Sequence, residues 1–69
     1  MMMVFSNGRE VDSALVEIVT FYHRDGRIGL RLDDGTFIDI EHANKSDREQ
    51  LEMSGLTTFE KQGSGINLV

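Results

Sequence analysis

Apolar and polar side chains alternate along much of the first forty residues, which is the pattern of β-strands with one buried face. The longest run, Ala14 to His23, is rich in β-branched and aromatic residues. It is followed by Asp25-Gly26, a dipeptide typical of tight turns. Residues 14 to 41 are therefore predicted to form a three-stranded antiparallel meander.

The pairing of apolar residues predicts the length of the second loop of this meander. A two-residue loop would place Leu30 opposite Asp39 and bury a carboxylate. A three-residue loop with Gly35 in the left-handed conformation places Leu30 opposite Ile38 and keeps the apolar side chains on one face. We therefore expect a type I turn followed by a glycine bulge.

Two further hairpins are expected at the ends of the chain. Asn7-Gly8 is well suited to a type I′ turn, because both central residues of that turn need a positive φ. Residues 3–5 should then pair with residues 10–12. Near the C-terminus, residues 56–62 and 65–69 have the composition of strands and are joined through a Gly-Ser-Gly segment, which predicts a C-terminal β-hairpin.

The segment between these regions has the signals of a short helix. Ser46 followed three residues later by Glu49 is the pattern of a capping box, and Asp47 adds negative charge at the helix N-terminus. Gly55 suits the left-handed residue that follows a last helical turn. These signals predict a helix over about residues 47–54.

Together these elements predict one small α+β domain over residues 1–69. Its sheet is an antiparallel meander, with one short helix and a C-terminal hairpin, and curling of the sheet into a partial barrel stays open. The chain of 69 residues has no cysteine, so no disulfide supports its small core. Its apolar ends leave strand edges that pairing would cover, and we expect a homodimer formed through edge strands.

The apolar runs also bear on location. They are far shorter than the ~18–20 residues that a membrane-spanning helix needs. We therefore expect a protein of the cytoplasm that makes no contact with membranes.

The polar residues between positions 21 and 40 resemble an active site at first sight. Aspartates at turns are favoured for another reason, since their short side chains bond nearby backbone amides. His23 has no serine or cysteine in a recognisable nucleophile motif beside it. Asp39 and Glu41 share a strand face next to His42, but their spacing matches no calcium loop. We expect no catalytic residue, no metal and no cofactor.

The charge of the chain points to a basic partner. With 12 acidic and 7 basic residues the net charge is −5, which disfavours phosphate backbones on average. We expect a small non-enzymatic protein-interaction domain that occupies a basic surface on another protein, as a regulator or inhibitor of the kind that phages and mobile elements also encode. The expected contact residues are Asp33, Asp34, Asp39, Glu41, Glu49 and Glu52, with Tyr22 and Phe59 as aromatic anchors.

Three other functions stay open at the level of sequence. The acidic surface can imitate nucleic acid and block a nucleic-acid-binding protein. Alternatively, the chain is a minimal barrel that binds single-stranded nucleic acid through an arginine and aromatic hairpin. The residues of that hairpin are Tyr22, Arg24, Arg27 and Arg31. An enzymatic function requires one of the two histidines, His23 or His42, to approach Asp39 and Glu41.

Overall fold

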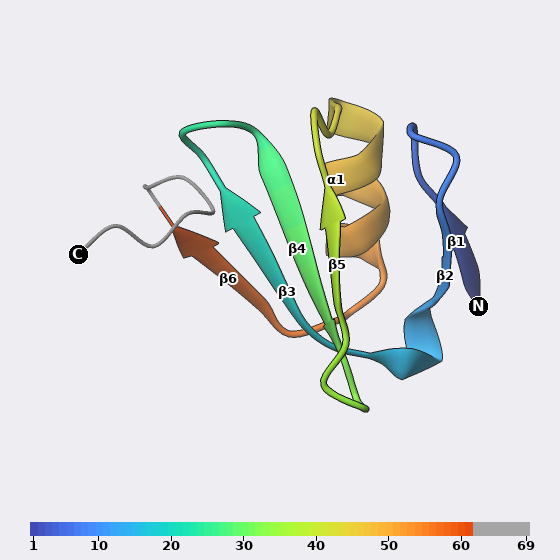
Figure 1. Ribbon diagram of the computed structural model, residues 1–69. Helices are drawn as coiled ribbons and strands as arrows, with labels where there is room; N and C mark the ends of the chain where they lie inside the picture. Colours follow the sequence, from blue (N-terminus) through green and yellow to red (C-terminus); the bar gives the residue numbers. More distant parts are fainter. Residues whose placement is uncertain (62–69) are drawn as a thin grey trace.

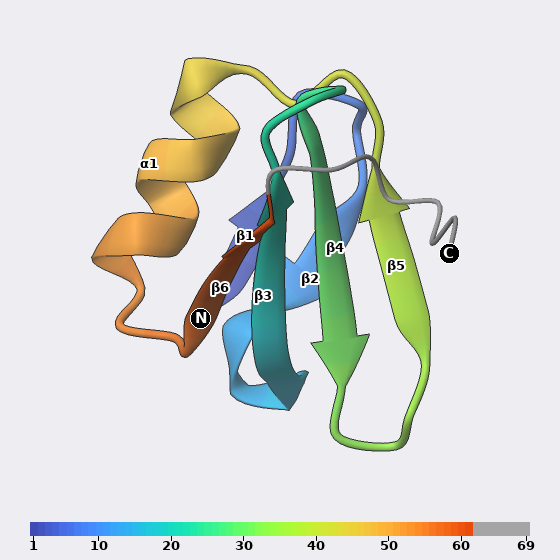
Figure 2. The same ribbon diagram turned by 90° about the vertical axis from the view of Figure 1, so that its left-hand side faces the viewer.

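The computed structural model describes residues 1–61 and has an α+β fold, as the sequence predicts. Four strands form a sheet of order β5-β4-β3-β6, and two more form a separate ribbon, β1-β2. The helix α1 and the ribbon lie on the same side of the sheet (Figures 1 and 2). The elements are β1 (Met2–Val4), β2 (Glu10–Asp12), a short 3-10 helix η1 (Ser13–Leu15), β3 (Val16–Tyr22), β4 (Arg27–Leu32), β5 (Phe37–Ile40), α1 (Lys45–Met53) and β6 (Thr58–Lys61).

The core fills the space between the sheet and the layer formed by α1 and the ribbon. One buried cluster contains apolar side chains from the ribbon, the sheet and the helix. The members of this cluster are Met3, Phe5, Val11, Val16, Val19, Phe21, Ile28, Leu30, Ile40 and Leu51. In residues 1–61 the strands form two separate sheets and do not close a barrel.

The predicted meander is confirmed. β3 pairs with β4, and β4 pairs with β5, in both cases antiparallel. Leu30 lies opposite Ile38, and Gly35 has a φ of 88°, so the second loop is the three-residue turn with a glycine bulge. The Leu32 N–H donates to the Thr36 carbonyl at 2.8 Å and closes this loop.

The N-terminal hairpin forms, but the prediction of a type I′ turn is wrong. The Phe5 N–H donates to the Arg9 carbonyl at 2.9 Å, so the loop contains three residues, and only Gly8 among them has a positive φ. Met3 consequently lies opposite Val11. This register places Met3, Phe5 and Val11 on one buried face, whereas a two-residue loop would turn Val11 to the opposite face.

The predicted helix is confirmed, with a start two residues earlier, at Lys45. Asn44 is the N-cap and accepts from the Asp47 N–H at 2.9 Å, while the Asp47 carboxylate accepts from the Asn44 N–H at 3.1 Å. The prediction of a capping box formed by Ser46 and Glu49 is therefore wrong. Glu49 is exposed and forms an ion pair with Lys45. The acidic residue that faces the ribbon is Asp47, which accepts from the Ser6 N–H.

β6 pairs with β3 in parallel, with Phe59 opposite Thr20, which the sequence did not predict. Parallel pairing needs a long connection between the two strands, and the segment from β3 to β6 contains β4, β5 and α1. β3 thus has a neighbour on each side, which fits its long run of β-branched and aromatic residues. The second strand of the predicted C-terminal hairpin, residues 65–69, lies outside the described residues.

The buried carboxylate of Asp47 joins the ribbon to α1. Ser6 donates to it twice, from its N–H at 2.8 Å and from its hydroxyl at 2.6 Å. Asp47 is only 2% exposed. Burial by itself raises the pKa of this carboxyl, but the hydrogen bonds from the Ser6 hydroxyl and from the Asn44 and Ser6 backbones outweigh it and lower the pKa.

Gln50, three residues after Asp47 and on the same side of the helix, continues this joint. Its side-chain amide accepts from the Val4 N–H at 3.3 Å and donates to the Val4 carbonyl at 3.0 Å. The backbone groups of Val4 that point away from β2 are thereby bonded much as a neighbouring strand would bond them. The outer edge of β1 is covered at this residue.

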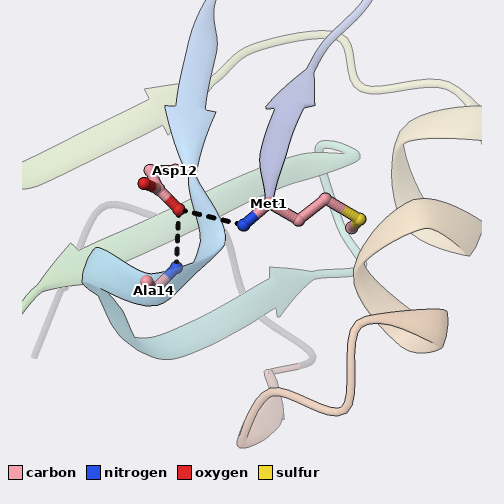
Figure 3. Close-up of polar contacts among 3 residues, drawn as sticks. All are labelled: Met1, Asp12 and Ala14. Carbon is pink, nitrogen blue, oxygen red and sulfur yellow. Dashed lines mark hydrogen bonds and ion pairs between the residues drawn. The ribbon is translucent and has the colours of Figure 1, made fainter.

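Asp12 fixes the corner between the ribbon and the sheet (Figure 3). Its Oδ1 atom accepts from the Ala14 N–H at 3.0 Å, which caps η1, and from the amino group of Met1 at 3.2 Å. The hydrogen bond from Ala14, and after it the contact with the amino group, lowers the pKa of Asp12. The turn from β2 into β3 therefore has a charged carboxylate at its centre at neutral pH.

The substitution Asp47→Asn, which removes the carboxylate that joins the ribbon to α1, is expected to lower the free energy of unfolding by about 2 kcal/mol at neutral pH. The donors of Ser6 and Asn44 bond to two carboxylate oxygens of Asp47, whereas an asparagine amide has only one acceptor oxygen. A buried donor without a partner costs about 1–3 kcal/mol. Urea denaturation followed by circular dichroism measures the loss. Asp39→Asn is the control, because it changes an exposed carboxylate and should alter stability by less than about 0.5 kcal/mol. Equal losses of stability at the two positions would contradict the role of Asp47 in joining the ribbon to α1.

The same carboxylate predicts a pH dependence. Because folding lowers the pKa of Asp47, its contribution is present above the unfolded-chain value of about 3.9 and is lost as the pH falls through the lower folded-state value. The difference in stability between the wild-type chain and Asp47→Asn should therefore shrink on acidification below pH 4. A difference that stays constant from neutral to acidic pH in urea titrations would show that ionisation of Asp47 contributes nothing.

Candidate functional site

The strands of the large sheet present one face to the core and the other away from it. We call the second the open face. Figure 2 looks onto this side of the sheet, with the β1-β2 ribbon behind, and in residues 1–61 neither α1 nor the ribbon covers it. A shallow depression of about 420 Å³ lies on this face. Its lining residues are Ile18, Thr20, Tyr22, Gly29, Arg31, Phe37, Asp39, Phe59, Glu60 and Lys61.

Strand register arranges the residues of the open face in three rows across the sheet, because residues opposite each other point to the same side. The first row, from β5 to β3, is Phe37, Arg31 and Ile18. The second row, from β5 to β6, is Asp39, Gly29, Thr20 and Phe59. The third row, from β4 to β6, is Arg27, Tyr22 and Lys61.

The Tyr22 ring lies close to Gly29, which leaves room for it. A Cβ atom at position 29 would stand 3.3 Å from the Tyr22 Cε2 atom and 3.9 Å from the Asp39 Oδ1 atom. On the same row, the Arg27 Cζ atom is 5.5 Å from the centre of the Tyr22 ring, within cation–π range. Gly29 thus leaves room for the Tyr22 ring near Asp39, and Arg27 lies beside the same ring.

Phe37 and Phe59 place large apolar surface at the two sides of the open face. Phe37 is 71% exposed on β5, and Phe59 is 53% exposed on β6. Phe59 was among the expected anchors, whereas Phe37 and Ile18 were missed. The signal for Phe37 was its phase, because it alternates with Ile38 and Ile40 and so must point away from the core that they face.

Two of the three arginines proposed for nucleic-acid binding lie next to acidic side chains. Arg31 forms an ion pair with Glu17 on the open face. The Arg27 Nε atom is 4.0 Å from the Asp25 Oδ2 atom. Arg24 lies in the exposed turn between β3 and β4. These pairs reduce the positive potential that a phosphate backbone would meet.

Four of the expected acidic contact residues lie along β5, the outer strand of the sheet. Asp33 and Asp34 are in the turn before it, Asp39 is on its open side, and Glu41 directly follows it. We call these four residues the acidic margin. Hydrogen bonds from Thr36, with an N–H to Oδ1 distance of 2.9 Å, lower the pKa of Asp34 and keep it charged. The other two acidic residues, Glu49 and Glu52, are on α1, across the sheet from the open face.

The two histidines are in different places. His23 follows β3, and its Nε2 atom is 2.8 Å from Glu60 Oε1 on β6. His42 follows β5 with a φ of 55° and shares a small surface depression with Asp25, Arg27 and Glu41. In residues 1–61 no three histidine, aspartate or glutamate side chains are grouped to hold a metal ion.

Comparison of the chain with protein-family models, with curated proteins and with solved structures found no match. Among residues 1–61, no helix has the length and apolar character that crossing a membrane requires.

Gly29→Val is expected to displace the Tyr22 ring from its seat on β4, because the added side chain would occupy the space under the ring. Tyr22 is the only tyrosine and the chain has no tryptophan, so intrinsic fluorescence reports on this ring alone. Acrylamide should quench it more strongly in the variant, while the far-ultraviolet circular dichroism stays close to wild type. Thr20→Val, on the same row, is the control; unchanged quenching in Gly29→Val would contradict the contact.

Proposed function

We propose that this chain is a non-enzymatic protein-interaction domain that docks on a partner protein through the open face of its sheet. The observation that supports this most directly is the group of three aromatic side chains, Tyr22, Phe37 and Phe59, on a sheet face that α1 and the ribbon leave uncovered. Aromatic residues are the usual energetic anchors of protein interfaces. Exposed aromatic side chains around one depression, with polar residues among them, are consistent with an interaction site.

The partner is proposed to be basic. The chain has a net charge of −5, and the acidic margin borders the open face along β5. Opposite charge speeds association and excludes partners of the same sign, while the aromatic residues contribute most of the affinity. Occupation of such a surface in the cytoplasm would make the chain a regulator or inhibitor of the partner.

Other functions receive less support from the arrangement of charges. A nucleic-acid mimic needs a continuous acidic track, but Glu49 and Glu52 are on the far side of the sheet from Asp39. Binding of single-stranded nucleic acid relies on arginines such as Arg31, which is paired with Glu17. A homodimer remains a proposed competing use of the sheet edges. Sedimentation of the purified chain over a range of concentrations would reveal it.

The double variant Phe37→Ser with Phe59→Ser is expected to weaken partner binding by about tenfold or more, because truncation of an interface anchor typically costs over 1 kcal/mol. Both side chains are exposed, so stability should change little. The tagged wild type is used to capture partners from lysate, with washes at rising salt and an assay for nucleic acid in the eluate. The captured protein is then titrated against each variant.

Met53→Ser is the matched control, since Met53 is an 87% exposed apolar residue on α1, away from the open face. It should bind the captured protein as the wild type does. Equal binding by the double variant, or nucleic acid as the captured species, would overturn the proposal.

A further inference from the structure

The outer edge of β5 has the backbone arrangement of a strand that lacks one neighbour. Residue pairs in an antiparallel ladder alternate between bonded and non-bonded pairs. Leu32 and Thr36 form the bonded pair that closes the loop, at 2.8 Å, so Ile38 also directs its backbone toward β4. Phe37 and Asp39 then direct their N–H and C=O groups away from β4. In residues 1–61 no strand pairs with this side of β5.

The ribbon edge provides a contrast. The outward backbone groups of Val4 on β1 are both bonded by the side chain of Gln50. The chain thus covers an edge of its small sheet with a glutamine from α1. Nothing equivalent among residues 1–61 bonds the outward groups of Phe37 and Asp39 on β5.

The side chains of β5 define what could pair there. On one side of the strand lie Phe37 and Asp39, at the border of the open face. On the other side Ile38 is only half-buried and packs against the core, so it retains apolar surface beside the edge. The acidic margin adds negative charge before, within and after the strand. An added strand would therefore be most stable with basic side chains toward Asp39 and apolar side chains toward Ile38.

We propose that β5 accepts an extended, lysine- or arginine-containing segment of the partner protein as an additional strand of the sheet. This inference rests on the proposed function and specifies how the partner binds. Backbone hydrogen bonds to Phe37 and Asp39 contribute affinity, and alternation of basic and apolar side chains contributes specificity. The added strand extends the sheet, so its basic side chains continue the open face beyond Phe37.

Charge favours pairing of β5 with a basic segment over pairing with a second copy of the chain. Two β5 strands paired across a two-fold axis would bring two acidic margins together, and like charges facing each other destabilise strand pairs. A basic segment meets the same residues with favourable charge. The segment must also be extended, because only an extended backbone matches the spacing of the outward groups on β5.

The test uses a short capped peptide of alternating lysine and valine. Its control has the same sequence and charge, but the backbone nitrogens of its lysines are methylated. The methylated peptide keeps its positive charge but cannot donate the backbone hydrogen bonds from its lysines to β5. Binding to the full chain is followed by Tyr22 fluorescence and by amide NMR. The lysine and valine peptide should bind one to one and slow hydrogen exchange at the amides of Phe37 and Asp39, and the control should do neither.

Two variants separate backbone pairing from charge. Asp39→Pro removes an outward N–H that β4 does not use, at an edge position where proline is tolerated, and should weaken binding by about tenfold. Asp39→Asn keeps that N–H and should weaken binding by only about threefold, with a smaller salt dependence. If circular dichroism shows that the proline variant is unfolded, hydrogen exchange at Phe37 and Asp39 of the wild-type chain, with and without the peptide, tests backbone pairing instead.

Equal weakening by the two variants, binding of the methylated peptide, or protection at other amides would overturn the inference. Concentration-dependent dimerisation that protects the amides of Phe37 and Asp39 without peptide would also overturn it. Failure here is distinguishable from failure of the proposed function. A captured partner that binds Asp39→Pro as tightly as wild type, but loses affinity for Phe37→Ser with Phe59→Ser, supports the open face and excludes pairing at β5.

Discussion

The carboxylate of Asp47 is the point at which the N-terminal ribbon and the helix become one layer. It accepts two hydrogen bonds from Ser6 and one from Asn44, and it is the buried charged side chain of residues 1–61. A buried carboxylate is costly unless its oxygens are bonded, so the ribbon and the helix are stable in this arrangement only together. Gln50 adds two hydrogen bonds to Val4 from the next turn of α1.

This joint determines which side of the sheet is covered. With α1 and the ribbon held together, their apolar residues Met3, Phe5, Val11 and Leu51 all meet the same sheet face. Among residues 1–61, α1 and the ribbon both lie on that side, so neither covers the other face. Phe37 and Phe59 are exposed on that other face, and they are the reason to propose docking there. Stability and the proposed function thus depend on opposite faces of the same four strands.

Local sequence signals predicted the helix and most strands well, but they predicted less well which residues pair with one another. The register of β4 with β5 followed from keeping Leu30 opposite Ile38, and the same reasoning applied to Met3 and Val11 would have corrected the N-terminal turn. Asn7-Gly8 favours a type I′ turn by local propensity, but burial of three apolar side chains outweighs that preference. The capping box was misplaced for a related reason: two overlapping patterns exist, and only the ribbon, distant in sequence, selects Asp47 over Glu49.

The candidate site shows the same division. Alternation and composition alone determined that strands, one helix and an acidic surface exist, because these depend on neighbours in the chain and on total charge. Tertiary structure decided that β6 runs parallel to β3, that Tyr22 and Phe59 share a face with Phe37, and that Glu49 and Glu52 are separated from Asp39. These outcomes depend on which elements pack together, and that is settled by hydrogen bonds and burial between residues tens of positions apart, such as Ser6 and Asp47.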